Sequence, residues 1–130
     1  GELDGGLKRM MASILSAASG CHYCQAHTAH GAATHAGVPQ QKLEHLWSFE
    51  THPAFSEHER TALRLALHAG SQPNCVSDED FINLRKYYSE SAIMEMMGVI
   101  GLFGFLNNWN HTLATELEAV PAAHLEQVNR

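Results

Sequence analysis

Apolar residues recur every three or four positions along most of the chain, the spacing of amphipathic helices. The first such segment carries one apolar stripe, formed by Leu7, Met10, Met11, Ile14, Leu15 and Ala18. Ser19 and Gly20 interrupt this pattern, so we expect a first helix to end there and a second to run from about Cys21 to His35. No stretch alternates with period two over a useful length, and the pattern therefore predicts an all-α fold.

Capping signals divide the middle of the chain. A third helix is expected over residues 43–50, ending before the His52–Pro53 dipeptide. The segment Ser56-Glu57-His58-Glu59 has the S-x-x-E form of a capping box, which predicts the start of a fourth helix. Ser77 precedes three acidic residues and is expected to cap a fifth helix that includes Tyr88.

The sixth expected helix is apolar almost all round, and its core run from Ala92 to Leu106 reads AIMEMMGVIGLFGFL. A membrane span needs about 20 apolar residues, whereas this run is shorter and contains Glu95, so we expect a buried helix and no membrane partner. A helix that is apolar on every side must be covered on every side. A second copy of the chain is one way to cover it, and the three evenly spaced glycines in the run fit either a close helix neighbour or a tight core.

Length and composition indicate one globular domain over residues 1–130. The chain is 45% apolar and 17% charged, which is typical of a folded protein. Its first residue is Gly1, so an N-terminal segment can be missing. The net charge of -6, with no basic run, counts against nucleic acid as a partner. Three cysteines and no recognisable signal peptide favour a cytoplasmic location.

The segment SGCHYCQAHTAH, residues 19–30, concentrates the candidate chemistry. Cys21 would lie in the first turn of the second helix, where unpaired backbone N–H groups and the helix dipole favour a thiolate. Cys24 lies three residues further on the same face, so one thiol can attack a substrate while the other closes a disulfide. His27 follows one turn after Cys24 and can transfer a proton.

Zinc is the main competing interpretation, since the two cysteines, His27 and His30 are all good ligand types. On a continuous helix each three-residue step turns by about 300°, so the four positions drift to opposite faces and do not converge on one ion. A metal held by two or three of them together with His58 or His111 remains an alternative. A further alternative is that both cysteines are buried core residues with no chemical role. Our expectation is no bound metal and no other cofactor.

The string SGCHYCQAHTAHGA resembles the signature of the carboxymuconolactone decarboxylase superfamily, specifically its alkyl hydroperoxidase D-like (AhpD-like) branch. The second half, from FSEHERTALRLA through an Asn- and Trp-rich segment to ATELE, is similar to the same branch, so the resemblance covers nearly the whole chain. It implies an all-α bundle of about six helices assembled as a homo-oligomer, a trimer or hexamer. It also implies thiol peroxidase or disulfide-reductase chemistry without flavin or haem.

Carried over residue by residue, the resemblance makes Cys24 the thiol that attacks a peroxide or disulfide substrate. Cys21 then resolves the sulfenic acid on Cys24 into a disulfide, which an external dithiol reduces. The chain would therefore be an enzyme, an alkylhydroperoxidase-related oxidoreductase. Two alternatives remain: a lactone decarboxylase like the founding members of the superfamily, and a non-catalytic oligomer that senses redox state or binds metal.

The proton-relay positions of the family carry different residues in this chain. The relay His, four residues after the second cysteine, is Thr28, and the relay Glu, twelve residues before the first cysteine, is Arg9. We expect His27, one residue earlier than Thr28, to act as the relay, because both offsets lie on the same helix face. Glu57 and Glu59 are candidates for the missing carboxylate, although capping already accounts for Glu59. The residues expected to line the site are Tyr23, Thr28, His30 and Glu59.

Overall fold

The computed structural model describes residues 1–117, and within them every regular element is helical. The elements are α1 (Gly5–Ala18), α2 (His22–Thr34), α3 (Gln40–Glu44), the 3-10 helix η1 (Leu46–Ser48), α4 (Glu57–Gly70), α5 (Asp78–Leu84) and α6 (Glu90–Leu113). The all-α prediction with about six helices is confirmed for this part of the chain. The last thirteen residues of the expected 1–130 domain lie outside the described residues.

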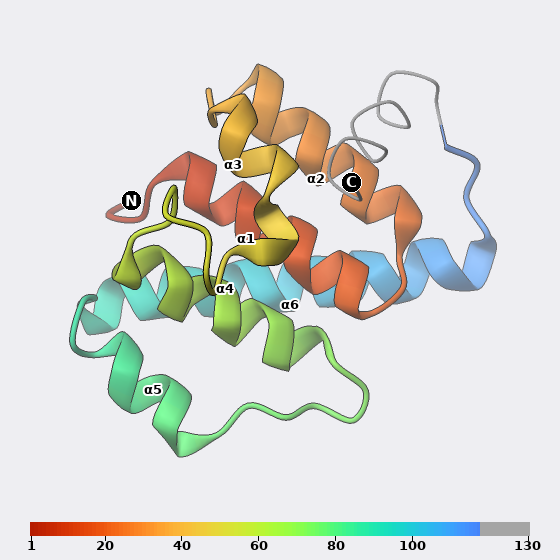
Figure 1. Ribbon diagram of the computed structural model, residues 1–130. Helices are drawn as coiled ribbons and strands as arrows, with labels where there is room; N and C mark the ends of the chain where they lie inside the picture. Colours follow the sequence, from red (N-terminus) through yellow and green to blue (C-terminus); the bar gives the residue numbers. More distant parts are fainter. Residues whose placement is uncertain (118–130) are drawn as a thin grey trace.

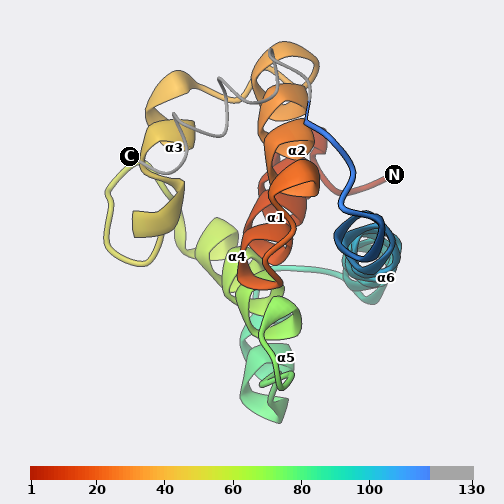
Figure 2. The same ribbon diagram turned by 90° about the vertical axis from the view of Figure 1, so that its right-hand side faces the viewer.

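Helix α1 is the centre of the bundle (Figure 1). It packs against α2 on one side and α4 on the other, and α6 runs along both α1 and α2. Figure 2 looks down α6 and shows it beside α1, with α5 at the far end of α4. The fully buried side chains at the centre include Met11, Ile14, Leu46, Leu63 and Met96, contributed by three α-helices and η1. The thiol-bearing helix α2 is therefore held between α1 and α6.

The turn between α1 and α2 forms where the sequence predicts it. Gly20 has a φ of +79°, in the left-handed region that glycine adopts without strain. Directly after it, the backbone N–H of Cys21 donates to the carbonyl of Ser16 at 2.8 Å. The chain reverses within these residues, so the α1–α2 turn fixes the position of Cys21 against the end of α1.

Two helix predictions need correction. The third helix is not continuous over residues 43–50, because the backbone leaves helical geometry at His45 (φ -110°, ψ 18°) and α3 and η1 are separate. The fifth helix ends at Leu84, so Tyr88 lies beyond it. The Tyr88 hydroxyl donates to the carbonyl of His58 at 2.7 Å, and this contact ties the segment before α6 to α4.

Helix α6 is not buried within one chain, contrary to the sequence-based expectation. Its buried residues are Ala92, Ile93, Met96 and Asn107. Its large exposed apolar side chains, which we call the α6 apolar face, are Met94, Leu102, Phe105, Trp109 and Leu113. A Cβ atom added at any of the three evenly spaced glycines would meet nothing within 4 Å. No helix within residues 1–117 combines the length and the apolar character that crossing a membrane requires.

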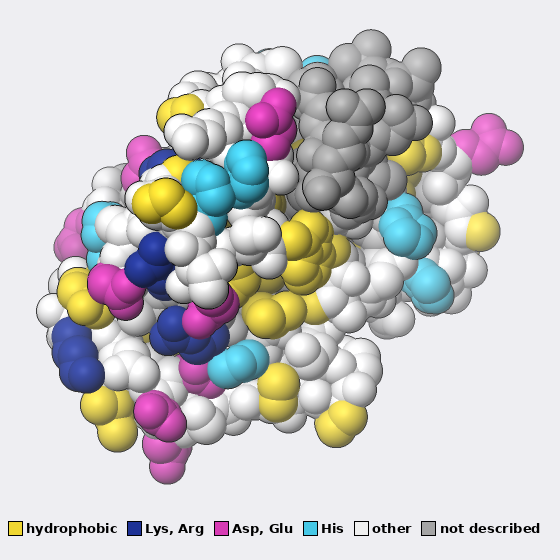
Figure 3. Space-filling view, viewed as in Figure 1, with side chains coloured by type: hydrophobic (Ala, Val, Ile, Leu, Met, Phe, Trp, Pro, Cys, Tyr) yellow, Lys and Arg dark blue, Asp and Glu magenta, His cyan; other side chains and the backbone are white. Residues whose placement is uncertain are grey.

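Charges of both signs intermix on the face that carries α4 and α5 (Figure 3). Arg60 pairs there with Glu57, and Arg64 binds Glu50 at 2.8 Å. Such exposed ion pairs contribute little to stability. Their mixture leaves no continuous basic stripe on the face shown in Figure 3.

Candidate thiol site

Cys21 caps the N-terminus of α2. Its backbone is extended (φ -86°, ψ 90°), and its Sγ accepts a hydrogen bond from the backbone N–H of Cys24 at 3.3 Å. This is the role that Ser or Asp usually fills at an N-cap, and it directs a backbone dipole at the sulfur. The sequence-based prediction that both cysteines share the first turn of one helix is therefore confirmed, and both are free thiols.

Cys24 is a buried thiol whose ionisation is disfavoured. Only 3% of the residue is exposed. Burial, followed by a hydrogen bond with the Cys21 thiol, raises the pKa of Cys24 to about 12. A hydrogen bond from Asn110 acts in the opposite direction. Cys24 therefore keeps its proton at neutral pH in this arrangement.

Asn110 is a site residue that the sequence analysis missed. It lies near the C-terminal end of α6, and its side-chain amide donates to Cys24 Sγ at 3.4 Å. The same amide group donates to the carbonyl of Leu106 at 3.0 Å, and its oxygen accepts from the Thr115 hydroxyl at 2.9 Å. This residue belongs to the Asn- and Trp-rich segment that supports the family resemblance. That segment is the sequence feature from which a role for Asn110 could have been predicted.

A second asparagine of α6 anchors the turn before the thiols. Ser16 Oγ donates to Asn107 Oδ1 at 2.9 Å, and Asn107 Nδ2 donates to Ser19 Oγ at 2.8 Å. Ser16 and Asn107 are both buried. These bonds hold the end of α1 against α6, and the same turn carries Cys21, so α6 positions both sulfur-bearing residues.

The other predicted site residues of α2 make contacts within or next to their own helix. The rings of Tyr23 and His27 pack with their centroids 4.4 Å apart. Thr28 is buried, and its hydroxyl donates to the carbonyls of Cys24 at 2.8 Å and Gln25 at 3.0 Å. His30 lies further along the helix, edge-on to His35 at 6.1 Å between ring centroids.

Glu59 is engaged away from α2. Its carboxylate accepts from Lys42 at 2.7 Å and completes the predicted capping box with Ser56. Burial raises the pKa of Glu59, but hydrogen bonds from Lys42 and Ser56 outweigh burial and hold that pKa below its ordinary value of 4.5. Helix α2 packs against α1, α6 and α3, whereas Glu59 begins α4. The structure therefore gives Glu59 a capping and ion-pairing role.

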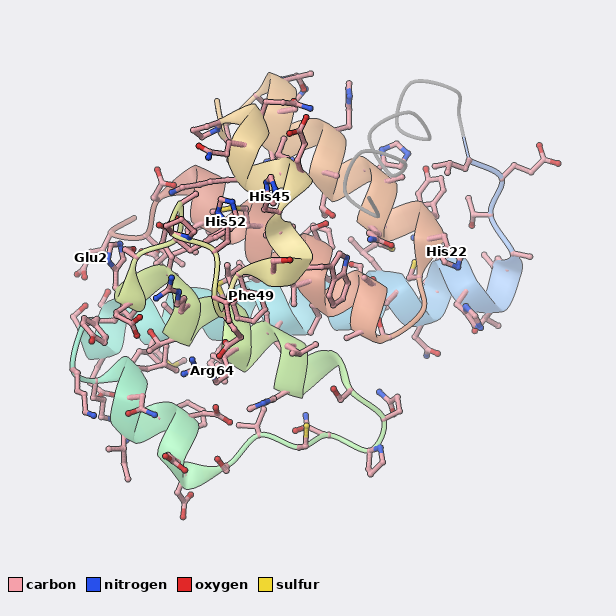
Figure 4. All side chains as sticks on the ribbon, viewed as in Figure 1. Glu2, His22, His45, Phe49, His52 and Arg64 are labelled. Carbon is pink, nitrogen blue, oxygen red and sulfur yellow. The ribbon has the colours of Figure 1, made fainter. Side chains whose placement is uncertain are left out.

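An open cavity of about 380 Å³ borders Cys21, of which 2% is exposed. It lies where the start of α2 meets the end of α6, and His22 is at this end of α2 (Figure 4). Its walls are formed by Gly20, Cys21, His22, Tyr23, Asn110, His111, Ala114 and Thr115. A small molecule in this cavity would meet Cys21, with histidine and asparagine side chains on either side.

No group of three or more His, Cys, Asp and Glu side chains within residues 1–117 is arranged to hold a metal ion. The combinations of the α2 ligands with His58 or His111 are therefore not assembled in this part of the structure. His58 is next to the Ser56 hydroxyl, with Nδ1 and Oγ 3.0 Å apart, and His111 lines the cavity at Cys21.

Two free thiols one turn apart, at a capped helix start beside an open cavity, define a CxxC dithiol site on an all-α scaffold. The chain belongs to the carboxymuconolactone decarboxylase family, whose model matches residues 1–68. The family resemblance recognised in the sequence is therefore confirmed.

Solved structures extend the comparison over almost the whole chain. The crystal structure of the debrominase Bmp8 in its apo form is 36% identical, with a TM-score of 0.91, and the match covers 97% of this chain and 67% of that one. A cysteine-to-alanine variant of Bmp8 in complex with 2,3,4-tribromopyrrole matches with the same identity and coverage and a TM-score of 0.90. No curated protein gives a significant match.

Proposed function

We propose that the chain is a dithiol oxidoreductase that passes two electrons to a small molecule and is left with a Cys21–Cys24 disulfide. The observation that carries the proposal is the placement of both free thiols in one helical turn, with Cys21 Sγ at 3.3 Å from the Cys24 amide nitrogen. Paired thiols at this spacing can form a disulfide without unfolding the helix.

The geometry favours Cys21 as the attacking sulfur and Cys24 as the resolving thiol. Both residues are buried, with 2% of Cys21 and 3% of Cys24 exposed. Cys21 lines the open cavity and its Sγ accepts a hydrogen bond from the Cys24 backbone N–H, whereas burial raises the pKa of Cys24. This order is the reverse of the one that the AhpD resemblance implies. A test is alkylation of a Cys75→Ser variant at mildly alkaline pH, followed by peptide mass spectrometry. We expect label on Cys21 first, and prior labelling of Cys24 would restore the order implied by the resemblance.

A peroxide is the first candidate substrate. The Cys21 thiolate would attack the peroxide oxygen and break the O–O bond, giving a sulfenic acid and an alkoxide that takes up a proton. The Cys24 thiol would then displace water from the sulfenic acid and form the disulfide. An external dithiol would return two electrons and two protons to the pair. A pair that must be reduced again in each cycle suits a reducing compartment such as the cytoplasm.

A brominated aromatic compound is a second candidate, favoured by the 36% identity to a debrominase over 97% of this chain. In that reaction the Cys21 thiolate would take the bromine as a sulfenyl bromide while the ring carbon gains a proton. The Cys24 thiol would then displace bromide to give the same disulfide. The sum is one C–Br bond and two thiols converted to one C–H bond, one disulfide and hydrogen bromide.

Both candidates are tested with one set of variants. Wild type, Cys21→Ser, Cys24→Ser and the matched control Cys75→Ser are each supplied with a dithiol and either cumene hydroperoxide or 2,3,4-tribromopyrrole. Peroxide loss or bromide release is then measured. We expect wild-type turnover in the control, which changes an exposed thiol, and none in the other two. Turnover that survives in both Cys21→Ser and Cys24→Ser would overturn the dithiol mechanism. No turnover of any substrate by wild type would favour a sensing role.

We also propose that the protein is a homo-oligomer in which the α6 apolar face is the contact between copies. This face carries Leu102, Phe105 and Trp109, each more than half exposed. Contiguous exposed apolar side chains of this size are typical of protein interfaces. A trimer or hexamer is the assembly that the family resemblance implies.

A further inference from the structure

A second cavity, of about 380 Å³, lies between α1, α2 and α6 and has no role in the thiol chemistry described above. It is lined by Gly5, Lys8, Arg9, Thr28, Val99, Leu102 and Phe103. Two of these side chains are cationic and come from neighbouring positions of α1, whereas the wall from α6 is entirely apolar. The cavity therefore combines a basic rim with a hydrocarbon-like surface.

The side chain of Arg9 extends from α1 to α2 and lies against Gly31. A Cβ atom added to Gly31 would be 2.2 Å from Arg9 Nη1 and 3.0 Å from Arg9 Cζ. Any side chain at position 31 would therefore collide with the guanidinium where it now lies. The absence of a side chain at Gly31 lets Arg9 rest against α2 beside Thr28.

The charge of Arg9 is not matched within residues 1–117. Arg60, Arg64 and Arg85 each bind a glutamate carboxylate, whereas no carboxylate of the described chain pairs with Arg9. Its neighbour Lys8 is already bound to Glu95 at 2.9 Å. In a protein of net charge -6, an arginine without an acidic partner at the edge of an apolar cavity is available for an anion from outside.

We propose that this cavity binds the carboxylate of an apolar acid, with Arg9 as its ligand. A guanidinium presents a planar fork of N–H donors that matches a carboxylate and can bind it through two parallel hydrogen bonds. The apolar body of the ligand lies against Val99 and Phe103, the half-buried side chains of the α6 wall. Apolar walls with one or two placed polar groups are the usual composition of a small-molecule site.

The site is close to the thiol pair but separate from it. Gly31 follows Cys24 by seven residues on α2, a rise of about 10 Å. Thr28 stands between them, lining the cavity while its hydroxyl binds the Cys24 carbonyl. Arg9 lies at the position for which the AhpD resemblance implies a relay Glu, so a cation stands at the edge of the cavity where the resemblance implies an acid.

Calorimetric titration with decanoate, and with decanol as its uncharged partner, tests the proposal. The protein used is the Cys21→Ser/Cys24→Ser variant, so no thiol chemistry contributes. We expect decanoate to bind, and Arg9→Gln to weaken it by about tenfold or more while binding of decanol is unchanged. Gly31→Ala should also weaken decanoate binding, because the new methyl group displaces the Arg9 guanidinium. Arg85→Gln, which removes an exposed paired arginine, should have no effect.

Equal binding of decanoate to the Arg9→Gln variant and its parent would overturn the proposal. An equal loss of affinity for decanoate and decanol would also overturn it. That result would indicate damage to the cavity rather than loss of the residue that binds the carboxylate. Circular dichroism spectra of all variants show whether the helices remain intact. The outcome does not depend on the thiol activity, since the two cysteines are absent throughout.

Discussion

The side-chain amide of Asn110 donates a hydrogen bond to Cys24 Sγ across 3.4 Å, joining two residues 86 positions apart in the chain. Burial raises the pKa of Cys24, and this bond opposes burial because a donor stabilises the negative sulfur. Helix α6 therefore tunes the reactivity of a thiol on α2, although no cysteine lies on α6.

We expect Asn110→Ala to raise the pKa of Cys24 further and to slow its alkylation several-fold at about pH 10. The measurement uses a Cys21→Ser/Cys75→Ser background, in which Cys24 is the only thiol. The matched control is Asn108→Ala, an exposed asparagine on the same helix. Identical alkylation rates in the two variants would mean that the hydrogen bond from Asn110 does not affect the reactivity of Cys24 Sγ.

Asn107→Ala is expected to destabilise the fold by about 1–3 kcal/mol, because it leaves the buried Ser16 hydroxyl without its acceptor. It also removes the donor that Ser19 receives in the turn before Cys21. Urea unfolding followed by circular dichroism measures the loss. Asn108→Ala should change stability by no more than about 0.5 kcal/mol, and a similar loss in both variants would argue against the network.

Acid stability should depend on Glu59. Its folded-state pKa is lower than its ordinary value of 4.5, so it stabilises the fold above that pH, and this contribution is lost as the pH falls through the lower folded value. We expect Glu59→Gln to cost about 1 kcal/mol at neutral pH and to lose less stability than wild type on acidification below 4.5. Urea midpoints measured from pH 7 to pH 3 provide the comparison.

The control for this effect is Glu57→Gln, two residues earlier in α4. Glu57 is largely exposed and pairs only with Arg60 of its own helix, so its replacement should change stability by no more than about 0.5 kcal/mol. A pH profile of Glu59→Gln parallel to that of wild type would show that the Lys42 and Ser56 contacts do not set the acid response.

Phe105→Glu is expected to dissociate the proposed homo-oligomer, because it places a charge in the α6 apolar face. Light scattering after size-exclusion chromatography gives the mass of each species. Ile82→Glu on α5 is the matched control, since Ile82 is 58% exposed and Phe105 is 62% exposed. An unchanged mass for Phe105→Glu, or a monomeric wild type, would remove α6 as the interface.

The sequence was sufficient where a local signal decides the structure. The Ser56 capping box, the Gly20 turn and the placement of Cys21 and Cys24 in one turn all follow from residues within four positions of each other. It was insufficient where a distant contact decides. The third helix divides at His45, and nearby Arg60 of α4 binds the carbonyls of Phe49 and His52, a contact that no periodicity records.

The same limit explains the candidate site. Periodicity placed the α2 residues correctly on one helix, but it could not say that α6 would cross α2 beside Cys24 and bring Asn110 to the sulfur. It also predicted a fully covered sixth helix, because an apolar run indicates that a helix has to be buried without indicating which surface buries it.

Helix α6 contacts the turn and the sulfur through Asn107 and Asn110, while its other side carries the α6 apolar face. In the proposed homo-oligomer, a second copy would cover one side of α6 while the opposite side holds the thiol-bearing turn through Asn107 and Asn110. A change in the contact between copies would then be felt at the cysteines through one helix.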